Sequence, residues 1–170
     1  MRTGRQGIAS IELACGLTEE VVRTFGEVRL RVFGTSMVPS ILPGDLVCVH
    51  RASLRDISSG EVVMFVRNER LFVHRVVDRQ LMAYSDSPRE SCLITRGDRL
   101  LQNDPPVSSL ELLGRVVSIE RGSRKVKLPD ARTNSLFVRL LQSSDRATYL
   151  YLRFVGCWRT LFLRRAKCQA

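Results

Sequence analysis

One serine, Ser36, stands where an alternating apolar pattern stops, in the stretch "VFGTSMVPSILPGD". A serine hydroxyl is a weak nucleophile by itself, and it becomes reactive when a neighbouring base removes its proton. The end of a strand is a rigid place from which to present such a group. The stretch therefore predicts a serine nucleophile, and the rest of the sequence has to supply its base.

Lysine and histidine are the common bases beside a catalytic serine. The only lysines are Lys125, Lys127 and Lys167, all beyond the predicted strands, which excludes a Ser–Lys pair within those strands. His50 and His74 remain. His74 lies in the middle of the apolar alternation "LFVHRVV", where a histidine is more often a hydrogen-bonded core residue than a base. Residue types alone therefore leave its role open.

Five blocks of the sequence resemble type I signal peptidases in order and spacing: "GTSMVPSILPGD", "GEVVMFV", "FVHRVV", "LITRGDRLLQNDPPV" and "LLGRVVSI". They are most similar to the endoplasmic-reticulum, archaeal and sporulation-type branch, in which histidine replaces the lysine of ordinary bacterial enzymes. The resemblance runs from Val28 to Gly122. It implies a mainly β peptidase fold of the signal-peptidase/LexA type, here followed by C-terminal helices.

The resemblance also implies a role for individual residues. Ser36 matches the nucleophile and His74 the general base. The family's two acidic residues fall on Asp98 and Asp104, with Asp104 as the triad member and Asp98 as the supporting carboxylate. Taken alone, each aspartate would be an ordinary turn residue. His50, at a strand end, is expected to be structural, and neither a cofactor nor a metal is expected.

Oxyanion and substrate-binding positions follow from the same resemblance and are Gly34, Thr35 and Met37. The family usually has a hydroxyl residue two positions before the nucleophile, where this chain has Gly34, and Thr35 stands at the usual glycine. The oxyanion hole is therefore expected to consist mainly of backbone N–H groups, notably that of Ser36.

Composition limits the classes of partner. The 170 residues are 44% hydrophobic, enough for a core, and the net charge of +10 favours an anionic partner. Aromatic residues make up only 6%, without the interleaved pattern of single-strand binders, so nucleic acid is not expected. The cysteines are five, scattered and never spaced as Cys-x-x-Cys, which indicates reduced thiols rather than disulfides or a zinc site.

Periodicity divides the chain into three parts. Residues 1–26 are expected to form a weakly structured arm with a short helix from Thr18, and residues 27–122 the peptidase-like domain. Residues 123–170 are expected to form a basic linker with amphipathic helices. A variable loop is expected at Gln80–Arg89 and a hairpin around Arg67–Arg70. The predicted strands are Glu27–Val32, Leu46–His50, Glu61–Val66, Leu71–Val77, Ser91–Thr95 and Leu110–Glu120, and the predicted helices are Ser135–Gln142 and Ala147–Leu163.

The segment Ala147–Leu163 carries an apolar stripe with arginines around it. Ordinary packing is the first interpretation of such a stripe, and an interfacial helix on an anionic membrane is the second. The apolar stretch Gly7–Leu17 is short and contains Glu12, so we expect neither a signal peptide nor a transmembrane helix. The expected location is the cytoplasm, with at most peripheral membrane contact.

The sequence thus predicts a serine endopeptidase that hydrolyses a peptide bond through an acyl-enzyme on Ser36. Its substrate is expected to be extended beside a sheet edge, and the resemblance implies small residues before the cut. One alternative is a LexA-type protein that cleaves itself, for which Cys15–Gly16 is a candidate bond. The other is a non-enzymatic binding module that uses the basic surface of the same fold.

Overall fold

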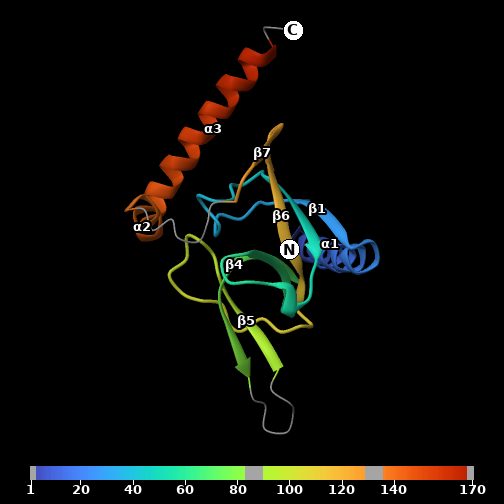
Figure 1. Cartoon of the computed structure of the whole chain (residues 1–170). Helices are drawn as coiled ribbons and strands as arrows, with labels where there is room; N and C mark the ends of the chain where they lie inside the picture. Colours follow the sequence, from blue (N-terminus) through green and yellow to red (C-terminus); the bar gives the residue numbers. More distant parts are fainter. Residues whose placement is uncertain (1–2, 83–89, 129–135, 168–170) are drawn as a thin grey trace. The chain divides into compact units, whose positions relative to one another are not determined.

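A computed structural model describes residues 3–82, 90–128 and 136–167 of the chain (Figure 1). Within them, seven antiparallel strands form one sheet in the order β1-β2-β6-β3-β4-β5, with β7 paired to β6. This sheet, together with the helices at the C-terminal end, confirms the predicted fold class. The strands are β1 Glu27–Arg31, β2 Leu46–Arg51, β3 Val62–Arg67, β4 Arg70–Met82, β5 Glu90–Arg96, β6 Leu112–Arg121 and β7 Arg124–Val126.

The first element is one long helix, α1, Thr3–Phe25. The expectation of a weakly structured arm with a helix only from Thr18 was therefore wrong. Thr18 is instead inside the helix, where its hydroxyl donates to the carbonyl of Ala14 at 2.7 Å. The helix ends as predicted, because Gly26 adopts a φ of 78° that favours glycine. Val22, fully buried, attaches α1 to the core of the sheet.

Two apolar clusters cover the two faces of the sheet. Val62 and Met64 belong to the first cluster and Val63 and Phe65 to the second. Because successive side chains of a strand point to opposite faces, the alternation along β3 separates the two clusters. The near-continuous apolar run of this strand reflects burial on both sides.

β3 and β4 form the predicted hairpin around Arg67–Arg70, with positive φ angles at Asn68 and Glu69. β4 is longer than the predicted Leu71–Val77, because Gln80, Leu81 and Met82 pair with β5. The first residues of the loop expected at Gln80–Arg89 are therefore strand, and residues 83–89 lie outside the described part. The two strands continue together beyond the rest of the sheet (Figure 1).

The basic linker expected after Gly122 begins with a further strand, β7. Gly122 takes a φ of 66°, and the resulting tight turn pairs Arg124 with Arg121. Val126 and Leu128 then pack, partly buried, against the first apolar cluster. Sequence reasoning missed β7 because its three residues are too few to show a period.

The chain divides into two compact units, Met1–Thr133 and Asn134–Ala170. The second contains α2, Leu136–Ser143, and α3, Asp145–Lys167, close to the helices predicted from periodicity. The hydroxyl of buried Thr148 on α3 donates to the carbonyl of Leu141 on α2 at 3.1 Å. Among the described residues, no helix is long and apolar enough to cross a membrane.

Candidate active site

Ser36 lies in the loop between β1 and β2, and hydrogen bonds close the base of this loop. The Val32 N–H donates to the Asp45 carbonyl at 2.9 Å, and the Gly44 N–H donates to the Val32 carbonyl at 2.6 Å. Gly44 has a φ of 89°, a conformation that favours glycine, so the Pro43-Gly44 turn can return the chain to β2. The loop is therefore clamped where it leaves the sheet.

A buried carboxylate fixes the returning arm of this loop. Asp45 is 0% exposed and accepts a hydrogen bond from the Leu42 N–H at 2.8 Å. Arg121 of β6 reaches the same carboxylate through Nη2 at 2.7 Å and also donates to the Ser40 carbonyl. The charge of Asp45 is thus paired and hydrogen-bonded, as a buried charge requires.

Met37, next to Ser36, anchors the loop in the core. Its side chain is 2% exposed and packs in the first apolar cluster together with Ile41. The Met37 side chain thus faces the interior, so a contact of Met37 with a substrate would be made by its backbone. The burial of Met37 restricts the backbone that carries Ser36.

His74 lies on β4, opposite Val63 of β3. Its side chain is nearly buried, and its ring meets the rings of Phe65 and Phe72 edge-on, with centroids 6.1 and 5.9 Å away. These two phenylalanines stack on each other at 5.4 Å. Aromatic packing therefore limits the orientations open to the imidazole.

Both ring nitrogens of His74 have partners expected from the sequence. Nε2 lies 3.0 Å from the Ser36 Oγ, and Nδ1 lies 2.6 Å from the Asp104 Oδ2. Because a carboxylate only accepts hydrogen bonds, Nδ1 carries the proton and donates a hydrogen bond to Asp104. Nε2 then has a lone pair that faces the serine hydroxyl. The structure thus brings Ser36, His74 and Asp104 together in the order that a serine hydrolase requires.

Asp104 is itself fixed by Thr95 of β5. The Thr95 hydroxyl donates to the Asp104 Oδ2 at 2.6 Å, and the Asp104 N–H donates to the Thr95 carbonyl at 2.8 Å. Burial raises the pKa of the Asp104 carboxyl, but hydrogen bonds from His74 and Thr95, with the nearby charges of His74 and Arg67, hold that pKa below its ordinary value. Asp104 is therefore ionised at neutral pH.

Asp98 lies in a different network from Asp104. It accepts two hydrogen bonds from Arg75, from Nε to Oδ1 and from Nη2 to Oδ2, each of 2.8 Å, and a short one from the Ser40 hydroxyl. Arg75 is 7% exposed and also donates to the Gly60 carbonyl. This ion pair joins β4, the segment after β5 and the nucleophile loop, so the contacts of Asp98 are with Arg75 and Ser40 rather than with His74.

The loop after β5 passes very close to the nucleophile. A Cβ at Gly97 would lie 2.7 Å from the carbonyl oxygen of Ser36 and 3.0 Å from its Cβ. The Arg99 N–H donates to the same carbonyl at 2.8 Å. Glycine is thus required at position 97 for the loop to hold the backbone of Ser36.

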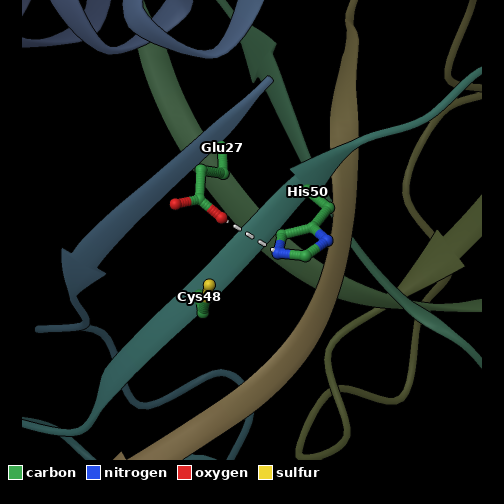
Figure 2. Close-up of side chains that lie close together, drawn as sticks. All are labelled: Glu27, Cys48 and His50. Carbon is green, nitrogen blue, oxygen red and sulfur yellow. Dashed lines mark ion pairs between the residues drawn. The ribbon is translucent and has the colours of Figure 1, made fainter. Parts of the chain in front are cut away.

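Of the remaining residues considered from the sequence, Gly34 and Thr35 lie in the loop with Ser36, whereas His50 lies elsewhere, on β2. Gly34 and Thr35 lie beside Ser36; Gly34 is exposed, and the Thr35 carbonyl accepts the Val38 N–H at 3.2 Å. His50 does not join the cluster of Ser36, His74 and Asp104, and its Nε2 instead lies 3.2 Å from the Glu27 Oε2 on the neighbouring strand (Figure 2). Of the two histidines, only His74 contacts the serine.

Three supporting residues were missed by sequence reasoning: Arg75, Thr95 and Gly97. Arg75 had one available signal, because an arginine next to His74 in an apolar strand has to find a buried partner. Gly97 precedes Asp98 in the quoted "RGD" stretch, but its close approach to Ser36 joins positions that lie far apart in the chain. Thr95 carried no signal beyond its place in a strand.

Comparison with known proteins supports the same class of fold. Residues 5–84 match the family model described as Peptidase S24-like, a match that covers less than half of the 170 residues. No curated protein matches the chain. The antiparallel sheet and the S24-like match together support a serine-peptidase-type fold of the LexA/signal-peptidase superfamily for this chain.

Proposed function

We propose that the chain is a serine endopeptidase that hydrolyses peptide bonds through an acyl-enzyme on Ser36. The observation that carries this proposal is the continuous set of contacts from the Ser36 Oγ through both nitrogens of His74 to Asp104, at 3.0 and 2.6 Å. These distances lie within reach for direct proton transfer. A core histidine with a purely structural role has no need of a serine on one nitrogen and a carboxylate on the other.

In the proposed reaction, the His74 Nε2 accepts the proton of the Ser36 hydroxyl while Oγ attacks the substrate carbonyl. His74 then gives this proton to the leaving amine, and a water molecule repeats the sequence on the acyl-enzyme. Asp104 keeps the Nδ1 proton in place and stabilises the imidazolium that forms. The developing oxyanion is met by backbone N–H groups of the loop around Gly34, Thr35 and Ser36.

The finer proposal is an activity like that of signal peptidase I, on a peptide that binds in extended form with small residues before the cut. Its support is the five-block resemblance from Val28 to Gly122 and the position of a histidine, rather than a lysine, 3.0 Å from the Ser36 Oγ. Processing of signal peptides at a membrane belongs to this finer proposal.

The test is Ser36→Ala assayed against a library of extended peptides. We expect cleavage to disappear while the melting temperature hardly changes, because the substitution removes one hydroxyl. Wild-type protein should also form a covalent fluorophosphonate adduct on Ser36, mapped by mass spectrometry. Full cleavage by the Ala variant would rule out the proposal.

Self-cleavage of the LexA type is the second candidate, favoured by the S24-like match. Its candidate bond, Cys15–Gly16, lies within helix α1, and the Cys15 side chain is 5% exposed. Proteases bind substrates in extended form, so this bond would first have to leave the helix. Incubation of the purified chain followed by intact-mass measurement distinguishes the candidates: a peptidase acting on other chains leaves its own mass unchanged.

A further inference from the structure

Away from the candidate active site, three side chains with metal-binding atoms converge on one face of the β1–β2 pair. Glu27 begins β1, while Cys48 and His50 lie two positions apart on β2. Glu27 is directly opposite His50 in the strand register, and residues two apart on a strand share a face. Figure 2 shows the three side chains gathered across the two neighbouring strands.

The donor atoms of this cluster are close to one another. The Glu27 carboxylate oxygen, the Cys48 sulfur and a His50 ring nitrogen all lie within 4.8 Å of each other, and the His50 Nε2 lies 3.2 Å from the Glu27 Oε2. In a tetrahedral zinc site, bonds of about 2.0–2.3 Å place neighbouring donor atoms roughly 3.3–3.8 Å apart. Side-chain rotations that move the donor atoms by about 1 Å are enough to reach that arrangement.

We propose that Glu27, Cys48 and His50 bind one zinc ion, with water as the fourth ligand. Thiolate, imidazole and carboxylate are the donors that zinc takes in proteins, and the sulfur disfavours calcium and magnesium. With a thiolate, a carboxylate and a neutral imidazole, the ligands carry two negative charges that balance the ion.

Burial of the three side chains matches this assignment. Cys48 is 8% exposed and is the one buried residue of the three. The side chains of Glu27 and His50 are 63% and 50% exposed, so both can turn toward an ion, and solvent can reach the fourth position.

Two arginines flank the cluster on the same face, and both already have acidic partners. Arg29 is opposite Cys48 in the register, and its Nη1 lies 3.7 Å from the Glu120 Oε1. Arg115 is opposite His50, and its Nη1 lies 3.5 Å from the Glu61 Oε1. Glu120 and Glu61 thus partly neutralise the two arginines. The arginines therefore repel a cation bound at the cluster less strongly.

The position of the site indicates what the ion would do. β1 is an edge strand of five residues, and Glu27 lies at the end of it that is remote from the loop with Ser36. An ion bound here ties β1 to β2 and fixes their register without contact with the nucleophile. The proposal is independent of the proposed peptidase function.

The test is a cobalt and zinc titration of the full-length chain after removal of metal by a chelator. To exclude the two tail thiols, the protein carries Cys157→Ser and Cys168→Ser. We expect one equivalent of Co²⁺ to bind with the near-ultraviolet absorption of a thiolate-to-cobalt charge transfer, and Zn²⁺ to displace it. Cys48→Ser should abolish that absorption, whereas Cys92→Ser, which removes another buried thiol on β5, should keep it.

Glu27→Gln and His50→Gln give a second test, because these exposed side chains can be changed without opening the core. Each should weaken zinc binding by at least about tenfold, since even outer partners of metal ligands contribute 10–100-fold. Zinc should raise the melting temperature of the wild type but not of these variants. Ser36→Ala should bind zinc like the wild type. Cobalt bound without a thiolate band, no stoichiometric binding, or unchanged affinity in both variants would each overturn the proposal.

Discussion

At the scale of residues, the candidate site depends on the tautomer of His74. The Asp104 Oδ2 accepts a hydrogen bond from the His74 Nδ1, 2.6 Å away, which leaves the Nε2 lone pair facing Ser36. Thr95 donates to the same carboxylate oxygen, which keeps Asp104 in its orientation. An asparagine in place of Asp104 can present an N–H to Nδ1 and select the wrong tautomer.

Asp104→Asn should therefore reduce kcat by about 10⁴-fold, the size of the effect seen when a triad aspartate is replaced in this way. The measurement is steady-state cleavage of whichever peptide the wild type accepts. Asp98→Asn should reduce turnover less, because Asp98 contacts Arg75 and Ser40 rather than the histidine. If Asp98→Asn is inactive while Asp104→Asn resembles the wild type, the two roles are exchanged.

Stability should also depend on Asp104 in a definite pH window. Its pKa in the folded chain lies below the ordinary value of 3.8, so folding favours the ionised form. The resulting stabilisation is fully present above about pH 4–5 and is lost as the pH falls through the lower folded-state pKa. The difference in free energy of unfolding between wild type and Asp104→Asn should therefore shrink between pH 5 and pH 2. Urea titrations across that range measure it, and a constant difference would contradict the assignment.

At the scale of elements, the site is assembled from three parts that an ion pair holds together. Arg75 on β4 and Asp98 after β5 bind through two hydrogen bonds of 2.8 Å, and the Ser40 hydroxyl connects them to the nucleophile loop. The side chains of Arg75 and Asp98 are 8% and 14% exposed. Removing Arg75 would take the positive charge away from the largely buried Asp98 carboxylate, and breaking a buried ion pair in this way is strongly destabilising.

Arg75→Met should thus lower the free energy of unfolding by about 3–5 kcal/mol. The matched control is Arg115→Met on β6. The Arg115 side chain is 44% exposed, and its Nη1 lies 3.5 Å from the Glu61 Oε1. That surface pair should contribute no more than about 1 kcal/mol. Chemical denaturation of both variants gives the comparison, and equal losses would show that Arg75–Asp98 has no special part in joining the elements.

Gly97→Ala tests how closely the loop after β5 approaches the nucleophile. Because the new methyl group would lie 2.7 Å from the Ser36 carbonyl oxygen, the backbone of Ser36 has to move. Overpacking of this kind typically destabilises by about 1–3 kcal/mol, and we expect kcat to fall with it. Gly16→Ala, in a helix with nothing within 4 Å of the new Cβ, is the control and should keep full activity. Full activity in Gly97→Ala would mean that this contact is unimportant.

At the scale of the whole molecule, the net charge of +10 and the helix α3 suggest contact with an anionic surface. Leu150 and Phe154 are 65% and 61% exposed, and Arg153 lies near them with its guanidinium over the Tyr149 ring. An apolar strip with basic residues beside it suits the interface of a membrane. We propose peripheral, partly electrostatic binding through residues 147–163.

Vesicles with anionic lipid should therefore sediment the protein at low salt and release it at 1 M salt, where the Debye length falls to about 3 Å. Arg153→Glu should weaken binding by more than tenfold, since replacing a basic residue near an anionic surface by an acidic one removes about 2 kcal/mol of attraction. Arg115→Glu on the first unit is the charge-matched control and should bind as the wild type does. Binding that resists salt and needs detergent for release would contradict a peripheral mode.

The sequence by itself predicted six of the seven strands in the described residues, and its family resemblance named Ser36, His74 and Asp104, which the structure brings together. Two-residue alternation marked the strands because their faces differ in burial, and Gly26 marked the end of a helix. The absence of lysine before Lys125 left histidine as the base, and the resemblance selected His74. The alternation, the glycine and the missing lysines are signals in neighbouring residues or residue types, whereas the resemblance depends on five blocks between Val28 and Gly122.

Only the tertiary structure decided which distant residues meet. The Arg75–Asp98 pair, the approach of Gly97 to Ser36, and the cluster of Glu27, Cys48 and His50 all depend on strand register and loop closure. The burial of the Met37 side chain was decided in the same way, since its neighbours in sequence do not show which way that side chain points. Contacts between segments far apart leave no period in the chain, because they are set by packing of the whole sheet.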